Sequence, residues 1–196
     1  MSILDLVKQN LTPELIGQLS SQLGASKDGT QSVVAQAVPV LVSALAKNAQ
    51  TTSGARSLDG ALAKDHDGSV LDNLGGLVAQ LGAGSAGDGI LKHVLGEKRP
   101  QVEQQLGQKS GIDLAQVGSV LITLAPIVMG ALGKKKQEEG LDADGVAKAL
   151  REDEQRAEAE APSFLEQLID QDKDGDIKDD LLSVGSTILG GFLGKK

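Results

Sequence analysis

The residues best suited to chemistry in this chain are six closely spaced acids, namely Asp170, Asp172, Asp174, Asp176, Asp179 and Asp180. Calcium prefers several oxygen ligands, and acidic side chains at alternate positions converge where a glycine permits a sharp turn. In the numbering of an EF-hand-type loop, Asp170, Asp172 and Asp174 take positions one, three and five. Gly175 takes the turn position, and Asp176 offers its backbone carbonyl. The stretch therefore predicts calcium as a cofactor.

This stretch departs from an EF-hand loop at two ligand positions. Leu181 stands where a bidentate Glu is expected, and Lys178 occupies the ninth position. Asp180 comes one place early, so the loop must be shortened or its last ligand contributed in another way. We expect calcium affinity that is ordinary to weak. The alternative is an aspartate-rich turn that only caps helices.

A related acidic turn occurs earlier, in "DHDGSVLDNL" at residues 65–74. Ala63 stands where the later stretch has Asp170, so the first ligand is missing. We interpret Asp65, Asp67 and Asp72 as turn and cap residues of a degenerate loop that does not bind metal.

Other sources of catalytic chemistry are missing from the sequence. The chain has no cysteine, and its two histidines, His66 and His93, lie far apart. It contains no G-x-S-x-G elbow, Walker lysine or H-E-x-x-H motif. We therefore expect a protein that is not an enzyme.

The secondary structure around these residues is predicted to be helical. Thr12 followed by Pro13 is typical of a helix start, and Asp113 with Gln116 has the spacing of a capping box. With two Phe and no Trp or Tyr, the core must be built from aliphatic residues, which suits close-packed helices. No two-residue period of strand length occurs, so we predict an all-α fold.

The sequence also repeats itself. A shift of 87 residues superposes residues 3–47 on 90–134 without a gap, and a shift of 107 superposes 65–74 on 172–181. The prolines and glycines that superpose are Pro13 and Pro100, Gly24 and Gly111, and Pro39 and Pro126. We predict two tandem copies of a small multi-helix repeat, at 1–84 and 88–196. The second copy has an inserted charged helix at about 135–162 and the Asp-rich loop at 170–180.

Charge is concentrated in the second copy. Residues 138–180 hold 16 of the 27 acids against five bases, a local balance of −11. The insertion is polar nearly all round, with Glu152 and Arg156 at i,i+4 spacing, so we expect an exposed helix braced by its own charges. A partner-specific arm is the alternative. Basic residues cluster only at 134–136 and 195–196, so we expect no nucleic-acid partner.

Residues 114–133 are uncharged and long enough to span a membrane. Pro126 interrupts them, and their repeat counterpart carries several polar residues, so we predict central core helices, kinked or broken near Pro39 and Pro126. The ending "TILGGFLGKK" could lie on a membrane surface, but the nearby aspartates would be repelled by anionic lipid. The start "MSILDLVKQN" lacks a basic segment, so we expect a cytoplasmic location.

Four segments resemble one bacterial family. They are "LAPIVMGALGKK", "AVPVLVSALAKN", "DGILKHVLGEKRPQV" and "LIDQDKDGDIKDDLL". Together they are similar to the domain of unknown function 937 family, which includes the YidB-like proteins. The resemblance implies a cytoplasmic helical bacterial protein with no assigned activity.

Two functional hypotheses follow from the sequence. The first is a non-enzymatic protein that binds other proteins, including itself as a homo-oligomer, because duplication places two similar surfaces on one chain. The second is a peripheral membrane-associated protein that uses its C-terminal amphipathic helix.

Overall fold

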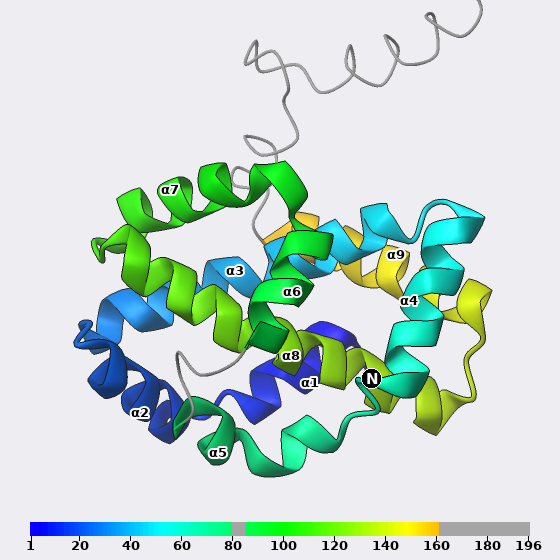
Figure 1. Ribbon diagram of the computed structural model, residues 1–196, viewed down its shortest axis with the longest axis horizontal. Helices are drawn as coiled ribbons and strands as arrows, with labels where there is room; N and C mark the ends of the chain where they lie inside the picture. The colour runs from blue at the N-terminus through cyan, green and yellow to red at the C-terminus, as the bar shows by residue number, and fades with distance from the viewer. Residues whose placement is uncertain (80–84, 161–196) are drawn as a thin grey trace, which may run out of the picture.

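The computed structural model describes residues 1–79 and 85–160, and it is all-helical over these ranges (Figure 1). The described residues form nine α-helices and two 3-10 helices, with no strand, which confirms the all-α prediction. The α-helices are α1 (Ile3–Asn10), α2 (Pro13–Leu23), α3 (Lys27–Asn48), α4 (Thr52–Lys64), α5 (Leu74–Ala79), α6 (Ser85–Val94), α7 (Arg99–Ser110), α8 (Leu114–Glu139) and α9 (Ala143–Glu160). The 3-10 helices are η1 (Ser69–Asn73) and η2 (Gly96–Lys98).

Local capping chemistry sets where the helices begin and end. The Thr12 hydroxyl accepts a hydrogen bond from the Leu15 N–H (3.3 Å), and Pro13 occupies the first turn of α2. Asp113 accepts from the Gln116 N–H (2.8 Å), while the Gln116 side chain accepts from the Asp113 N–H (3.1 Å). Both predicted helix starts are therefore confirmed. These caps satisfy backbone donors that a helix N-terminus leaves unpaired.

The two longest helices, α3 and α8, contact each other at the centre of the molecule (Figure 1). Helices α1, α4, α6 and α7 also pack on α8, and α2, α7 and α9 pack on α3. By length and composition alone, α3 and α8 could each cross a membrane, but most of each apolar window is buried. The core helix of a soluble protein passes the same test, so this finding is weak support for a membrane span.

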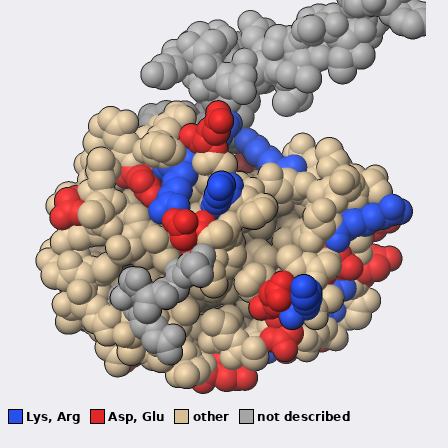
Figure 2. Space-filling view, in the orientation of Figure 1, with Lys and Arg blue, Asp and Glu red and all other residues tan. Residues whose placement is uncertain are grey.

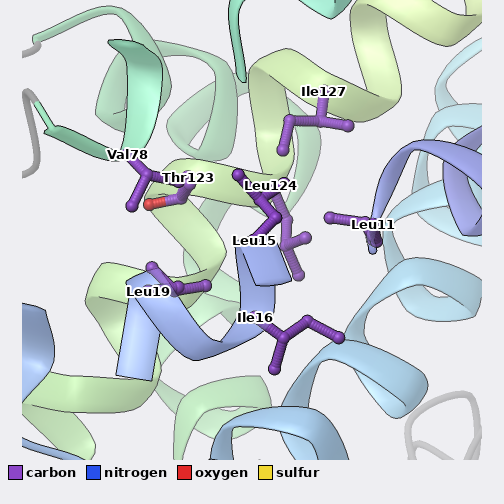
Figure 3. Close-up of a pocket in the computed structure, with 8 residues that line it drawn as sticks. All are labelled: Leu11, Leu15, Ile16, Leu19, Val78, Thr123, Leu124 and Ile127. Atoms are coloured by element: carbon purple, nitrogen blue, oxygen red, sulfur yellow. The ribbon is translucent and has the colours of Figure 1, made fainter. Parts of the chain in front are cut away.

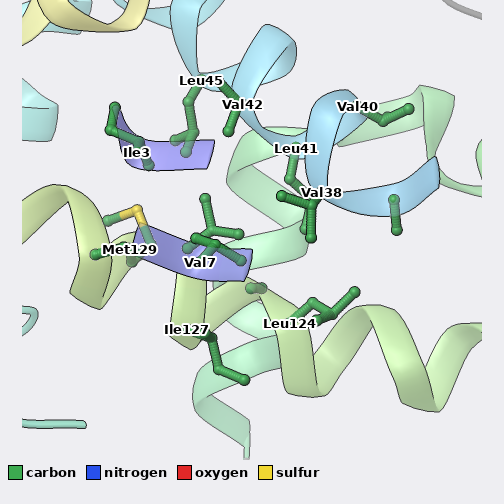
Figure 4. Close-up of a cluster of buried hydrophobic side chains, with 14 of the residues drawn as sticks. Ile3, Val7, Val38, Val40, Leu41, Val42, Leu45, Leu124, Ile127 and Met129 are labelled. Carbon is green, nitrogen blue, oxygen red and sulfur yellow. The ribbon is translucent and has the colours of Figure 1, made fainter. Parts of the chain in front are cut away.

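The core is aliphatic and draws on both halves of the chain. In Figure 4, Ile3 and Val7 of α1 lie among side chains of α3 and α8, including Leu41 and Leu124. All four of these residues are at most 1 % exposed. Helices on both sides of residues 80–84 thus share one hydrophobic cluster. The proposed division into copies at 1–84 and 88–196 remains a prediction.

Pro39 and Pro126 lie inside α3 and α8, and both helices continue through them. The sequence predicted helices kinked or broken near these prolines, and neither of these two described helices is broken there. Pro126 lacks an N–H group, so the carbonyl four residues earlier, that of Ile122, loses its usual helical partner. Gly87 of α6 packs here so closely that a Cβ atom would overlap the Ile122 carbonyl oxygen. The crossing of α6 over α8 therefore requires glycine.

Helix α9 differs from the expected exposed helix. Val146, Leu150, Asp153 and Ala157 are each at most 2 % exposed and recur at helical spacing on one face. This face packs against α3, with further contacts to α4 and α1. The prediction of an exposed helix braced by its own charges is wrong for this face, which is buried. The face is made largely of alanine and includes an acid. Such a face lacks the strong apolar stripe that usually identifies a core helix.

Candidate functional site

The six aspartates of the predicted calcium loop, at 170–180, lie outside the described residues. Calcium binding there remains a prediction.

The earlier acidic turn is described, and one of its aspartate side chains, that of Asp67, bonds the local backbone. Asp67 Oδ1 accepts a hydrogen bond from the Ser69 N–H (3.0 Å). Hydrogen bonding with the Ser69 side chain, and then with this N–H, lowers the pKa of the Asp67 carboxyl. The Asp65 N–H donates to the Ala61 carbonyl (2.9 Å) at the end of α4. Asp72 lies exposed in η1. Within 1–79 and 85–160, no three His, Asp or Glu side chains are grouped to hold a metal ion.

The same turn packs tightly on α8. A Cβ atom on Gly133 would overlap the His66 carbonyl oxygen, and one on Gly130 would meet a Val70 methyl group. His66 is half-buried, and burial lowers the pKa of its imidazole, although Asp65 opposes the shift. The turn's observed role is to close over a glycine-lined stretch of α8.

A small apolar pocket lies between α2, α5 and α8 (Figure 3). Its lining residues are Leu11, Leu15, Ile16, Leu19, Val78, Thr123, Leu124 and Ile127. The only hydroxyl among them, that of Thr123, donates to the Ser119 carbonyl at 2.9 Å within α8. The cavity volume is about 10 Å³, roughly the space of one water molecule. This pocket is too small and too apolar to orient a substrate.

The chemically unusual group in the described structure is Asp153 on α9, which sequence reasoning did not select. Its side chain is 2 % exposed, and Oδ2 accepts a hydrogen bond from the Ile3 N–H at 2.8 Å. The two residues are 150 positions apart, so the first turn of α1 is capped by a side chain from another helix, α9. Asp153 Oδ1 is buried with no hydrogen-bond partner among the described residues. In the sequence, the helical spacing of Val146, Leu150 and Ala157 was the signal that could have predicted Asp153 on the buried face.

Burial dominates the electrostatics of Asp153 and raises the pKa of its carboxyl. The Ile3 N–H opposes this shift most strongly, followed by the charges of Arg156 and Lys135 and then by the Ser2 hydroxyl. Asp5, exposed in the first turn of α1, shows the opposite behaviour. Its pKa is lowered, chiefly by hydrogen bonding with the Ser2 side chain. Two carboxyls at one helix end are therefore shifted in opposite directions, because only one is buried.

The basic run at 134–136 is partly engaged in structural contacts. Lys136 Nζ lies 2.6 Å from Asp59 Oδ1 and donates to the Leu141 carbonyl at 2.8 Å. Lys135 Nζ lies 2.6 Å from Glu139 Oε1. Figure 2 shows charges of both signs side by side, with wide uncharged areas between them. A continuous basic face of the kind that nucleic-acid binding needs is absent from the face shown.

Comparison with known proteins gives one match. A family described as bacterial protein of unknown function (DUF937) matches residues 5–137, from α1 almost to the end of α8. No curated protein and no solved structure matches the chain. Helix α9 and the Asp-rich stretch lie beyond the matched residues. The resemblance seen in the sequence is confirmed, because the match covers more than half of the 196 residues. The chain therefore belongs to the bacterial domain of unknown function 937 family.

Proposed function

We propose that this chain is a duplicated helical protein that acts by binding other proteins, including further copies of itself, and not by catalysis. The observation that carries the proposal is the order of its helices. In each half a short helix precedes a helix with proline in its first turn, and a long helix containing an internal proline follows.

Details at the helix ends support the duplication. Helices α2 and α7 both end at a glycine in the left-handed region, Gly24 with φ 61° and Gly111 with φ 71°. The prolines in their first turns and the glycines at their ends superpose at the same shift of 87 residues that superposes Pro39 on Pro126. Glycine is favoured at these helix ends because it adopts positive φ without strain.

Duplication favours self-assembly for a geometric reason. Two similar but not identical surfaces on one chain can meet head to tail, and such contacts either close into a ring or propagate. The proposed partner is therefore a protein, with this chain itself as the first candidate. We place it in the cytoplasm and propose no nucleic-acid partner.

The proposed calcium loop at 170–180 would add an ion-dependent element. Its closely spaced carboxylates repel one another, and a bound cation relieves this repulsion. Calcium binding would then either stabilise the chain or regulate its association.

A mixing experiment tests this proposal. Two preparations of the full chain, each with a different affinity tag, are mixed and one tag is captured with and without calcium. Self-association predicts that the second tag is recovered in an amount that rises with concentration. The variant Asp170→Ala should keep the calcium-free recovery and lose any calcium-dependent increase. Failure to recover the second tag at every concentration tested, with and without calcium, would contradict self-assembly.

The alternative is a peripheral membrane protein that uses the apolar stripe and two lysines of "TILGGFLGKK". Such a stripe can lie in the interfacial region of a bilayer. Flotation with liposomes separates the two proposals. A chain that stays at the bottom of the gradient with neutral and with anionic vesicles is not directed to lipid.

A further inference from the structure

Helix α9 is held to the rest of the molecule by a modest apolar face. Among the residues of α9 whose burial is described, 143–158, Val146 and Leu150 are the large buried side chains, and the other buried apolar residues are Ala147, Ala149 and Ala157. A short connection at 140–142 joins α9 to α8, beginning at Gly140 with φ 62°. Because alanine buries little apolar area, the polar contact in this face contributes a large share of the free energy that holds α9 in place.

That polar contact is Asp153. When ionised, its carboxylate is buried. Its Oδ2 accepts a hydrogen bond from the Ile3 N–H at 2.8 Å, and its Oδ1 has no hydrogen-bond partner among the described residues. A buried charge that is incompletely hydrogen-bonded is disfavoured, whereas the protonated carboxyl is neutral and still accepts from Ile3. Undocking of α9 would return the group to water, where the ionised form is favoured.

We propose that Asp153 makes the docking of α9 depend on pH, so that α9 is held most firmly when this carboxyl is protonated and opens more readily as the pH rises. The proposal goes beyond self-assembly, since it concerns a conformational device within one chain. Opening would uncover the apolar surface of α3 on which α9 packs.

Charged groups on α9 itself and on α1, α3, α4 and α8 surround this contact. On α9, Arg156 is exposed and attracts the Asp153 carboxylate, as does Lys135 of α8, which is also paired with Glu139. On α1, Asp5 lies at the same helix end, and on α4, Asp59 is paired with Lys136. On α3, Lys47 interacts with Glu154 and Glu158, farther along α9. Burial outweighs the attractive charges and raises the pKa of Asp153.

Because the pKa of Asp153 is raised, docking of α9 is favoured at low pH. A carboxyl whose pKa is raised in the docked state stabilises docking fully below its ordinary pKa. This stabilisation is lost as the pH rises through the raised pKa. Glu154 is also partly buried, and its pKa is raised by burial and by Glu158, so it acts in the same direction. A variant that changes only Asp153 separates the two groups.

Hydrogen exchange of the full chain tests the proposal. Exchange of α9 amides is measured between about pH 4 and pH 8 and corrected for the intrinsic rate at each pH. In the wild type, the opening equilibrium should rise with pH by about tenfold for each unit by which the pKa is raised. Asp153→Asn keeps an oxygen for the Ile3 N–H and cannot ionise. It should lose most of this rise and hold α9 closed at neutral pH.

Glu152→Gln is the matched control, because Glu152 is the exposed neighbour on the same helix. It should keep the wild-type pH dependence. An α9 opening equilibrium that does not change with pH in the wild type overturns the proposal. So does an Asp153→Asn variant with the full wild-type slope. Failure of Asp153→Asn to fold, judged by circular dichroism, also overturns it, because the charged form would then be required for docking.

Discussion

Replacing Gly133 with alanine tests the close packing of the acidic turn on α8. Gly133 lies inside α8, and the Cβ atom of alanine would overlap the His66 carbonyl oxygen and approach the His66 carbonyl carbon to 2.9 Å. These are backbone atoms and cannot rotate away. The turn at 65–73 must therefore move off the helix, or α8 must shift.

Two further glycines provide graded controls. At Gly130 the new Cβ would meet a methyl group of Val70, and a side chain can move more easily than backbone. At Gly60, on the exposed surface of α4, nothing lies within 4 Å of an added Cβ. Alanine in an open helical position stabilises by roughly 0.5–1 kcal/mol relative to glycine. Overpacking in a filled site costs about 1–3 kcal/mol.

The expected changes in unfolding free energy follow from these two terms. Gly133→Ala should lose about 1–2 kcal/mol net, Gly130→Ala should lose less, and Gly60→Ala should gain roughly 0.5–1 kcal/mol. For a chain of this size, each kcal/mol changes Tm by about 2–4 °C. Gly133→Ala should thus melt roughly 2–8 °C below the wild type. The assay is thermal unfolding followed by circular dichroism. If Gly133→Ala raises Tm as Gly60→Ala does, the turn does not contact α8 as described.

Three further predictions concern single side chains and one ion. Asp153→Ala should cost about 1–3 kcal/mol in urea unfolding at neutral pH, because the Ile3 N–H loses its acceptor, whereas Asp153→Asn, which keeps an acceptor and carries no charge, should stabilise. Asp113→Ala should cost roughly 0.5–2 kcal/mol through loss of the α8 cap, while alanine at the exposed Glu138 should change stability little. Calcium at ~1 mM acting on a ~10 µM site should stabilise the chain by ~2.7 kcal/mol. Asp170→Ala should abolish that increase, whereas Asp65→Ala should leave it intact, and an unchanged Tm on adding calcium to the wild type would reject the site.

Much of the secondary structure could be predicted because its causes are local. Thr12 with Pro13, and Asp113 with Gln116, carry helix-start chemistry within four residues of sequence. The uncharged stretch at 114–133 likewise identified a central helix, since a helix apolar on all sides is buried.

Features that depend on distant contacts could not be predicted in the same way. Aspartate is a residue type that usually lies on the surface. The burial of Asp153 depends on its contact with Ile3, which is 150 positions away in the sequence. From the sequence, Gly130 and Gly133 are expected only to weaken a helix. In the structure their lack of a side chain lets the turn at 65–73 pack closely on α8. Pro126 reads as a helix breaker, but α8 continues through it because packing of the surrounding helices offsets a cost of about 3 kcal/mol.

Light scattering on the size-fractionated full chain tests the proposed self-assembly most directly. The molar mass should be measured over a range of concentrations, with calcium and with a chelator. Self-assembly predicts a mass above the 20.1 kDa of a single chain, increasing with concentration. A constant mass of one chain at every concentration, with and without calcium, would contradict it.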